Sequence, residues 1–210
     1  MKWNDEYWPL LLWLYKRKPE GVKAVYSHDL VDIALRLHIH PSDLHKKMME
    51  LRNPTSPYLK HVLEEYQNQK KLNKAMKILM EKDGYGTSGK YYDEIDTKES
   101  WELDFRPLDE RKDITPVHLT LILDQYFRLT PTTMVTQTEE IQELAKLIKI
   151  PASLITQIME IFQFCDPYLN RGDIMIDPLL CPCQEIWNRY GNDDTEKLAA
   201  LAAQLKEYFR

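Results

Sequence analysis

The feature that most constrains the fold of this chain is an internal duplication. Residues 48–51 (Met-Met-Glu-Leu) and 56–59 (Ser-Pro-Tyr-Leu) recur 110 positions later as Ile-Met-Glu-Ile and Asp-Pro-Tyr-Leu. If one extra residue is allowed near His40, the match extends upstream and covers about residues 7–59 and 118–169. A repeat of this length predicts two copies of one structural unit.

Local signals predict three helices in each copy. Apolar residues recur at helical spacing in the first helix, an N-cap serine or threonine precedes the second, and proline opens the third, where its missing amide costs nothing. In the first copy we expect helices at residues 5–17, from Ser27 to about Leu37, and from Pro41 onward; in the second copy at residues 117–129, from Thr138 to about Ile148, and over 151–162.

The last two helices of each copy resemble a helix-turn-helix. The small residues Ala34 and Ala145 lie where two helices must approach closely in such a motif. The turn position that often carries glycine is His38 in one copy and Lys149 in the other, a departure from the motif. The resemblance implies that the third helix is the one that enters the major groove of DNA.

A β-hairpin is expected after the third helix of the second copy. Residues 166–169 and 174–177 flank Asn-Arg-Gly-Asp at 170–173, a good turn sequence for two antiparallel strands. In the first copy residues 61–66 are predicted to be helical, so the hairpin is degenerate or absent there. Three helices followed by a hairpin look like a winged-helix domain. The chain is therefore predicted to be mostly α with a small β-hairpin, in tandem winged-helix-like (helix-turn-helix) modules.

Composition divides the chain into two modules and a linker. We expect residues 1–83 to form the first module, residues 84–114 an acidic linker, and residues 115–210 the second module, which ends in an added helix. The linker begins with three glycines within 84–89 and continues as an acidic run. Within it, apolar residues 101, 103 and 105 alternate with acids, which favours an extended strand docked on a module.

Charge is divided unequally between these parts. Residues 1–90 carry 16 basic and 11 acidic side chains, whereas residues 91–113 and 114–210 each have a net charge of −5. Only the first part has the sign that favours a polyanion. The candidate DNA contacts are His45, Lys46, Lys47 and Arg52 on the third helix, with Lys70, Lys74 and Lys77 at i, i+4 and i+7 on a later helix. The alternative is an ordinary solvated lysine face.

The first helix suggests a protein interface instead. Its apolar residues cover nearly every face, and such a helix must be covered on more than one side. Docking of the two modules is the first explanation and homodimerisation the second. The candidate interface residues are Trp3, Trp8, Leu12 and Trp13.

No residue pattern predicts catalysis, a cofactor or a metal. The chain has no phosphate-binding glycine loop, nucleophile elbow or His-Glu-x-x-His sequence. Cys181 and Cys183 form one short pair without the second pair that a structural zinc site needs. No apolar run approaches the roughly 18–20 residues that span a bilayer, and Tyr7–Tyr15 lacks the features of a signal peptide. We expect a cytoplasmic protein that makes no membrane contact.

Two functions remain open from the sequence. The first is a non-enzymatic DNA-binding transcriptional or chromosome-associated regulator, in which module 1 contacts double-stranded DNA. Because the third helix of module 2 has no lysine or arginine, that module and the first helix are expected to bind a protein partner or a second copy of the chain. The alternative is a protein-interaction adaptor that uses the same modules without touching DNA.

Overall fold

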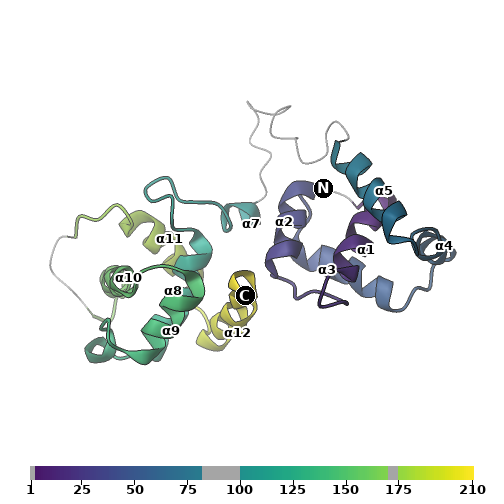
Figure 1. Ribbon diagram of the computed structural model, residues 1–210. Coiled ribbons are helices and arrows are strands. Elements are labelled where there is room, and N and C mark those ends of the chain that lie inside the picture. Colours follow the sequence, from purple (N-terminus) through teal and green to yellow (C-terminus); the bar gives the residue numbers. More distant parts are fainter. Residues whose placement is uncertain (1–2, 82–99, 170–174) are drawn as a thin grey trace. The chain divides into compact units, whose positions relative to one another are not determined.

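The computed structural model describes residues 3–81, 100–169 and 175–210 (Figure 1). The chain divides into two compact units, unit 1 from Met1 to Glu99 and unit 2 from Ser100 to Arg210. Every regular element within the described ranges is a helix.

Unit 1 is built around its first long helix. The elements of the unit are η1 (Asp5–Tyr7), α1 (Trp8–Lys16), α2 (His28–Leu37), α3 (Pro41–Arg52), α4 (Pro57–Glu65) and α5 (Gln69–Glu81). Helix α1 packs against α3, α4 and α5. Its leucines 10, 11, 12 and 14 are all buried, and they form the centre of the core together with Leu30, Leu44, Met48 and Leu72. Burial of these side chains is the main stabilising contribution available to so small a unit.

Unit 2 has the same plan around α8. Its elements are α7 (Ser100–Leu103), α8 (Pro116–Arg128), η2 (Pro131–Thr133), α9 (Glu139–Ile148), α10 (Ala152–Cys165), α11 (Leu180–Tyr190), α12 (Thr195–Leu205) and η3 (Lys206–Phe209). Helix α8 packs against α9, α10, α11 and α12. Every residue from 117 to 126 is buried, so α8 is a core helix on all its faces.

The duplication seen in the sequence is present in the backbone. Helices α2 and α9 are both ten residues long, and each ends at a residue in the left-handed conformation, His38 with φ 52° and Lys149 with φ 60°. The central helices α1 and α8 each contact the two helices that end their unit. The repeat therefore extends past Leu59 and Leu169 to a five-helix unit. Helix α11, which was not predicted from the sequence, follows α10 as α4 follows α3.

The α9–α10 pair has the geometry of a helix-turn-helix. The two helices are joined by Lys149, Ile150 and Pro151 and meet at 109°, within the roughly 90–120° typical of that motif. No single described helix is long and apolar enough to span a membrane. Helices α9 and α10 reach the required length and composition only when the bent pair is taken together.

The predicted β-hairpin of the second copy is wrong, and with it the winged-helix assignment. Residues 167–169 form a turn and residues 175–177 are irregular, while the central turn residues 170–174 lie outside the described part of the chain. Tyr168 is 92% exposed and Ile176 is 94% exposed. An isolated pair of strands is marginal in water without an apolar face to pack on a core. These side chains provide no such packing.

The second half of the predicted linker belongs to unit 2. Phe105 and Ile114 are buried in that unit, and Asp104 forms an ion pair with Arg189 of α11 at 2.7 Å. The backbone amide of Val117 also donates to the carbonyl of Asp104 at 3.1 Å. The extended strand expected around residues 101–105 is instead the short helix α7 followed by a turn. Glu102 is buried and Leu103 is exposed, the reverse of the alternation that a docked strand requires.

Candidate nucleic-acid interface

Helix α3 presents the first set of predicted DNA contacts. Proline 41 opens the helix, and the ring of His40 accepts a hydrogen bond from the amide of Ser42 at 3.2 Å, which satisfies an amide at the helix start. The buried stripe of the helix contains Pro41, Leu44, Met48 and Leu51. His45 is half-buried and Arg52 is exposed.

The two lysines of α3 are neutralised by acids on their own helix. The ammonium of Lys46 lies 2.9 Å from Asp43, and the ammonium of Lys47 lies 2.9 Å from Glu50. The hydrogen bond from Lys46 lowers the pKa of the Asp43 carboxyl below its usual value. Both pairs are three residues apart, a spacing at which side chains of one helix meet. The outward face of α3 is therefore much less positive than its lysines suggest.

Lys47 is also part of an aromatic cluster with the start of the chain. Its ammonium lies 5.6 Å from the ring centre of Trp3 and 5.7 Å from that of Trp8, within cation–π range. The indole N–H groups of Trp3 and Trp8 donate to one oxygen of Asp5 at 3.0 and 3.1 Å. The two indoles pack edge to face at 4.9 Å. This lysine therefore stabilises the packing of α3 on α1, a role separate from ligand binding.

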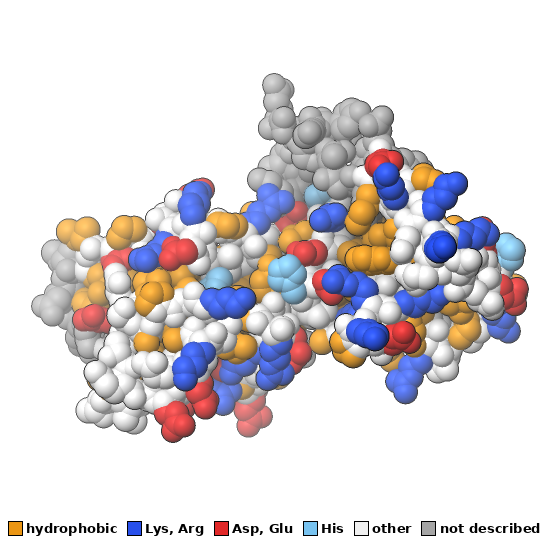
Figure 2. All heavy atoms as spheres, in the orientation of Figure 1, with side chains coloured by type: hydrophobic (Ala, Val, Ile, Leu, Met, Phe, Trp, Pro, Cys, Tyr) orange, Lys and Arg blue, Asp and Glu red, His pale blue; other side chains and the backbone are white. Residues whose placement is uncertain are grey.

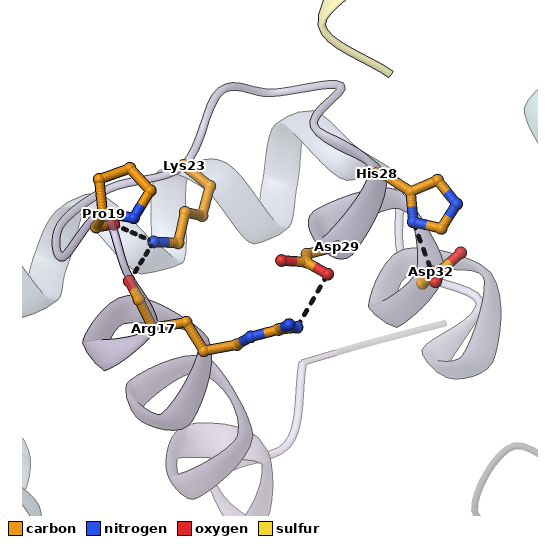
Figure 3. A network of polar contacts seen from close by, with 6 residues as sticks. All are labelled: Arg17, Pro19, Lys23, His28, Asp29 and Asp32. Atoms are coloured by element: carbon orange, nitrogen blue, oxygen red, sulfur yellow. Dashed lines mark hydrogen bonds and ion pairs between the residues drawn. The ribbon is translucent and has the colours of Figure 1, made fainter. Parts of the chain in front are cut away.

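Arg17 and Lys23 stabilise the loop between α1 and α2 (Figure 3). Arg17 donates to Asp29 at 2.9 Å, and the ammonium of Lys23 donates to the backbone carbonyls of Arg17, at 2.7 Å, and of Pro19. Burial lowers the pKa of Lys23. In the first turn of α2, His28 contacts Asp32 at 3.3 Å. Arg17 is thus paired with an acid, whereas Lys23 donates to neutral carbonyls and keeps its charge.

Helix α5 presents the second set of predicted contacts. Lys70, Lys74 and Lys77 are exposed and, by helical geometry, lie opposite the buried stripe of Leu72, Met76 and Leu79. Lys70 and Lys74 form no ion pair with another described residue, whereas the ammonium of Lys77 lies 3.7 Å from Glu81. Of the two candidate sets, α5 therefore keeps the more available charge. Figure 2 shows Lys and Arg side chains spread over unit 1 among exposed hydrophobic ones.

The two predicted sets lie on separate helices of unit 1. Helices α3 and α5 both pack on α1. The lysine next to the α5 set, Lys71, is directed to α4, where it pairs with Glu65 at 3.0 Å and lies 5.9 Å from the ring of Tyr66. Burial raises the pKa of the Tyr66 hydroxyl.

The predicted protein interface on the first helix divides into buried and half-buried residues. Trp8 is 3% exposed and Leu12 is 2% exposed, and α1 is surrounded by α3, α4 and α5 of its own unit. Trp3 and Trp13 are half-buried, and the guanidinium of Arg17 lies 5.0 Å from the ring centre of Trp13. The core of unit 1 therefore accounts for a helix that is apolar on every side, without a second module or a second copy.

An open apolar groove on unit 1 was not predicted from the sequence. It is lined by residues of η1, α1, α4 and α5 and has a volume of about 400 Å³. Its most exposed apolar members are Ile78 and Tyr58. One residue indicates the groove in the sequence. Ile78 is an apolar side chain on the same outward part of α5 as the lysines.

The polar residues of α10 in unit 2 are engaged within the unit. The hydroxyl of Thr156 donates to the carbonyl of Ser153 at 2.9 Å, and the amide of Gln157 donates to Asp177 at 2.9 Å. Gln163 is buried and its amide contacts the sulfur of Met134 at 3.4 Å. No lysine or arginine lies on α10, so this helix has no side chain suited to phosphate.

The described cysteines and acids offer no metal-binding group. No set of three or more His, Cys, Asp or Glu side chains within the described ranges could hold a metal ion. Burial raises the pKa of the Cys165 thiol to about 11 and raises that of Cys183 further. Since the thiolate is the reactive form, the raised pKa of both thiols favours the less reactive protonated form at neutral pH.

Comparison with known proteins does not identify a family for this chain. No family model, no curated protein and no solved structure matches this chain. The protein is therefore described by its architecture alone. It consists of two five-helix units that share a sequence repeat; the first part of the chain is basic and the second is acidic.

Proposed function

We propose that this chain is a non-enzymatic DNA-binding protein in which unit 1 contacts the phosphate backbone of a duplex through α5. The observation that carries the proposal is the exposed face with Lys70 and Lys74, which have no acidic partner among the described residues. Cations that neutralise phosphates provide most of the affinity of non-specific binding. A transcriptional or chromosome-associated role fits such a protein.

Helix α3 contributes little to this proposed contact. The Lys46–Asp43 pair is exposed, with 75% of the lysine side chain accessible, and exposed pairs of this kind are worth only about 0–1 kcal/mol. Lys46 can therefore exchange its acid for a phosphate, while Lys47 stays on the indoles. Because phosphate contacts carry no sequence information, we propose binding with weak sequence preference.

The salt dependence of duplex binding tests the proposal. The logarithm of the affinity should fall with the logarithm of the salt concentration, with a slope of about −0.9 for each phosphate neutralised. Replacing Lys70, Lys74 and Lys77 together by glutamine should flatten that slope. The matched control replaces Lys112, Lys146 and Lys197, three exposed lysines of unit 2, by glutamine and should leave the slope unchanged. Absence of binding at low salt, or equal slopes in both variants, would refute the proposal.

A second candidate function is a protein-interaction adaptor that does not contact DNA. The observation that favours it is the open apolar groove of unit 1, whose lining includes Tyr58 and Ile78. Monomeric soluble proteins seldom leave contiguous apolar surface open unless it has a binding role. In this case the lysine substitutions on α5 should leave partner binding intact, while polar substitutions in the groove should abolish it.

A further inference from the structure

The apolar groove of unit 1 has a counterpart surface in unit 2, since the two units share one repeat. At the start of the first helix, the N-cap residues Asn4 and Thr115 lie 111 positions apart, which is the offset of the sequence repeat upstream of His40. The last helices also match. Three buried residues of α5 recur 126 positions later as buried residues of α12: Leu72, Met76 and Leu79 correspond to Leu198, Ala202 and Leu205.

The fourth helices of the two units match in the same way. A buried aliphatic residue and a tyrosine four positions after it recur 124 positions later: Val62 and Tyr66 in unit 1, Ile186 and Tyr190 in unit 2. The larger offset reflects the longer connection before α11. Glu65, which lines the groove, therefore corresponds to Arg189 of α11.

This surface is closed in unit 2 and open among the described residues of unit 1. Val117 and Thr120 of α8 are 1% and 4% exposed. Their counterparts at the offset of 111 are Glu6, which is exposed, and Pro9, which is half-buried, and both line the groove. What stays open beside Tyr190 is a pocket of about 120 Å³, against about 400 Å³ for the groove.

The segment 100–106 covers the counterpart surface in unit 2. The carbonyl of Asp104 accepts from the amide of Val117 at 3.1 Å, and its carboxylate pairs with Arg189 at 2.7 Å. Phe105 follows in the turn after α7 and is 8% exposed, with its ring centre 5.2 Å from that of Tyr208. A helical turn followed by a buried aromatic ring is therefore what closes this surface.

The groove of unit 1 lacks the polar partners that hold Asp104 in unit 2. The amide of Glu6, at the place of Val117, donates to the side chain of Asn4 at 3.1 Å. The place of Arg189 is taken by an acid. Conversely, Ile78 is 59% exposed where α12 has the polar Gln204. Burial of apolar surface is thus the main contribution that a ligand of the groove can gain.

We propose that the groove binds a short segment of a partner protein that is built like residues 100–106, with one helical turn followed by an aromatic side chain. The aromatic ring would pack on the apolar lining, which includes Pro9, Val62 and Ile78. Residues 100–106 of a second copy do not fit this role, because they are packed in their own unit and Asp104 would meet Glu65. The inference goes beyond the proposed DNA contact, which does not depend on the groove.

A peptide without net charge provides the probe. It has the sequence of residues 100–108 with blocked ends and Asp104→Asn, so that one glutamate and one arginine remain. Titration into the ¹⁵N-labelled full chain should give saturable shifts of the amide signals of α4 and α5. A comparison peptide with Phe105→Ala should bind about tenfold more weakly or less tightly still. Because a free peptide loses translational freedom that the attached segment does not lose, weak binding is expected.

Substitutions to glutamine on one helix identify the surface that is used. Ile78→Gln introduces the residue that unit 2 has at this place and should weaken binding by about tenfold. Met80→Gln removes another exposed apolar side chain of α5, one that does not line the groove, and should leave the affinity unchanged. Tyr58→Gln on α4 repeats the groove substitution. Since these three side chains are at least 43% exposed, circular dichroism should show all variants folded.

Four results would overturn the proposal. They are the absence of saturable shifts, shifts confined to α8 and α11 of unit 2, equal binding of the two peptides, and equal weakening by Ile78→Gln and Met80→Gln. A dimer of the unmodified chain in sedimentation that Ile78→Gln converts to a monomer would also overturn it, because the occupant would then be a second copy. None of these substitutions removes an α5 lysine, so the salt dependence of duplex binding is measured separately.

Discussion

A buried histidine makes the stability of unit 2 depend on pH. His118 lies in the first turn of α8, where its Nδ1 accepts from the amide of Thr115 at 3.0 Å and lies 2.8 Å from the hydroxyl of the same residue. The ring of Phe209 covers it at 4.9 Å. Burial lowers the pKa of His118 from 6.5 to about 4, although a hydrogen bond with the backbone of Ile148 and the charge of Asp113 act in the opposite direction. The imidazole is therefore neutral in the folded protein.

The sign and size of the effect follow from these two pKa values. Between pH 6.5 and about pH 4 the unfolded chain binds a proton that folded His118 does not bind, so the free energy of unfolding decreases as the pH falls. Each unit of pKa difference corresponds to about 1.4 kcal/mol. The neutral histidine thus contributes about 3 kcal/mol above pH 6.5 that is lost as the pH falls through about 4.

The substitution His118→Gln isolates this contribution. Carboxylates titrate in both proteins, so only the difference between their pH profiles reports the histidine. Urea unfolding at several pH values, followed through the amide signals of α8 and α9 in NMR spectra, measures unit 2 by itself. We expect the unmodified chain to lose about 3 kcal/mol more than His118→Gln between pH 7 and pH 4. His61→Gln, at an exposed position of α4, is the control and should follow the unmodified chain.

Two results would contradict this account of His118. Parallel stability profiles for the unmodified chain and His118→Gln would show that the histidine does not couple to folding. A direct NMR titration of the ring with a midpoint near 6.5 would show that the ring is accessible to protons in the folded state. Either outcome would mean that η3, which carries Phe209, does not seal the start of α8.

Three further predictions test the core and the helix ends. Lys149→Gly should raise the free energy of unfolding of unit 2 by about 1 kcal/mol, because the φ of 60° at Lys149 is costly for a residue with a Cβ. Lys146→Gly, inside α9, should instead lower the free energy of unfolding by about 1 kcal/mol. Thermal melts in which both substitutions change the stability in the same direction would refute the reasoning. Trp8→Ala should destabilise unit 1 by about 3–5 kcal/mol, whereas Trp13→Ala, at a half-buried position, should cost less, as denaturant titrations can show. Phe209→Ala should move the pKa of His118 upward from about 4 because it exposes the ring to water, and an unchanged NMR titration would count against that contact.

Local sequence signals were sufficient for most helices. Ser27 and Thr138 precede α2 and α9 as predicted, and the predicted ends at Leu37 and Ile148 agree with the structure. Both residues stand at the N-cap position, although neither side chain makes the capping hydrogen bond that the pattern predicts. The left-handed residues His38 and Lys149 end the two helices. Helix α11 was missed because its stability comes from packing, such as that of Trp187 against Phe127 at 5.6 Å, and its sequence carries no strong local start signal.

Local signals also produced the hairpin that the structure does not contain. The Asn-Arg-Gly-Asp turn is favourable by itself, but strands need an apolar surface to cover. The side chains of Tyr168 and Ile176, which would have formed the strands, are almost fully exposed. Whether such a surface exists is decided by how α10 and α11 pack on α8.

The candidate site was predicted in part. The lysine spacing of α5 follows from the sequence, and the exposure of Lys70, Lys74 and Lys77 agrees with an outward face. The neutralisation of Lys46 and Lys47 by acids at i−3 and i+3 could have been inferred from the sequence. The contact of Lys47 with Trp3 and Trp8 could not, since it joins residues that only the packing of α3 on α1 brings together.

The sequence by itself determined that this chain consists of two related helical units, where most of their helices begin and end, and which residues carry positive charge. Only the tertiary structure decided that α1 is covered within its own unit, that Lys47 of α3 lies on two indole rings, and that the described residues leave one flank of α5 open. The physical reason is that propensity, capping and repeat spacing depend on neighbouring residues. Burial and charge neutralisation instead depend on which helices meet.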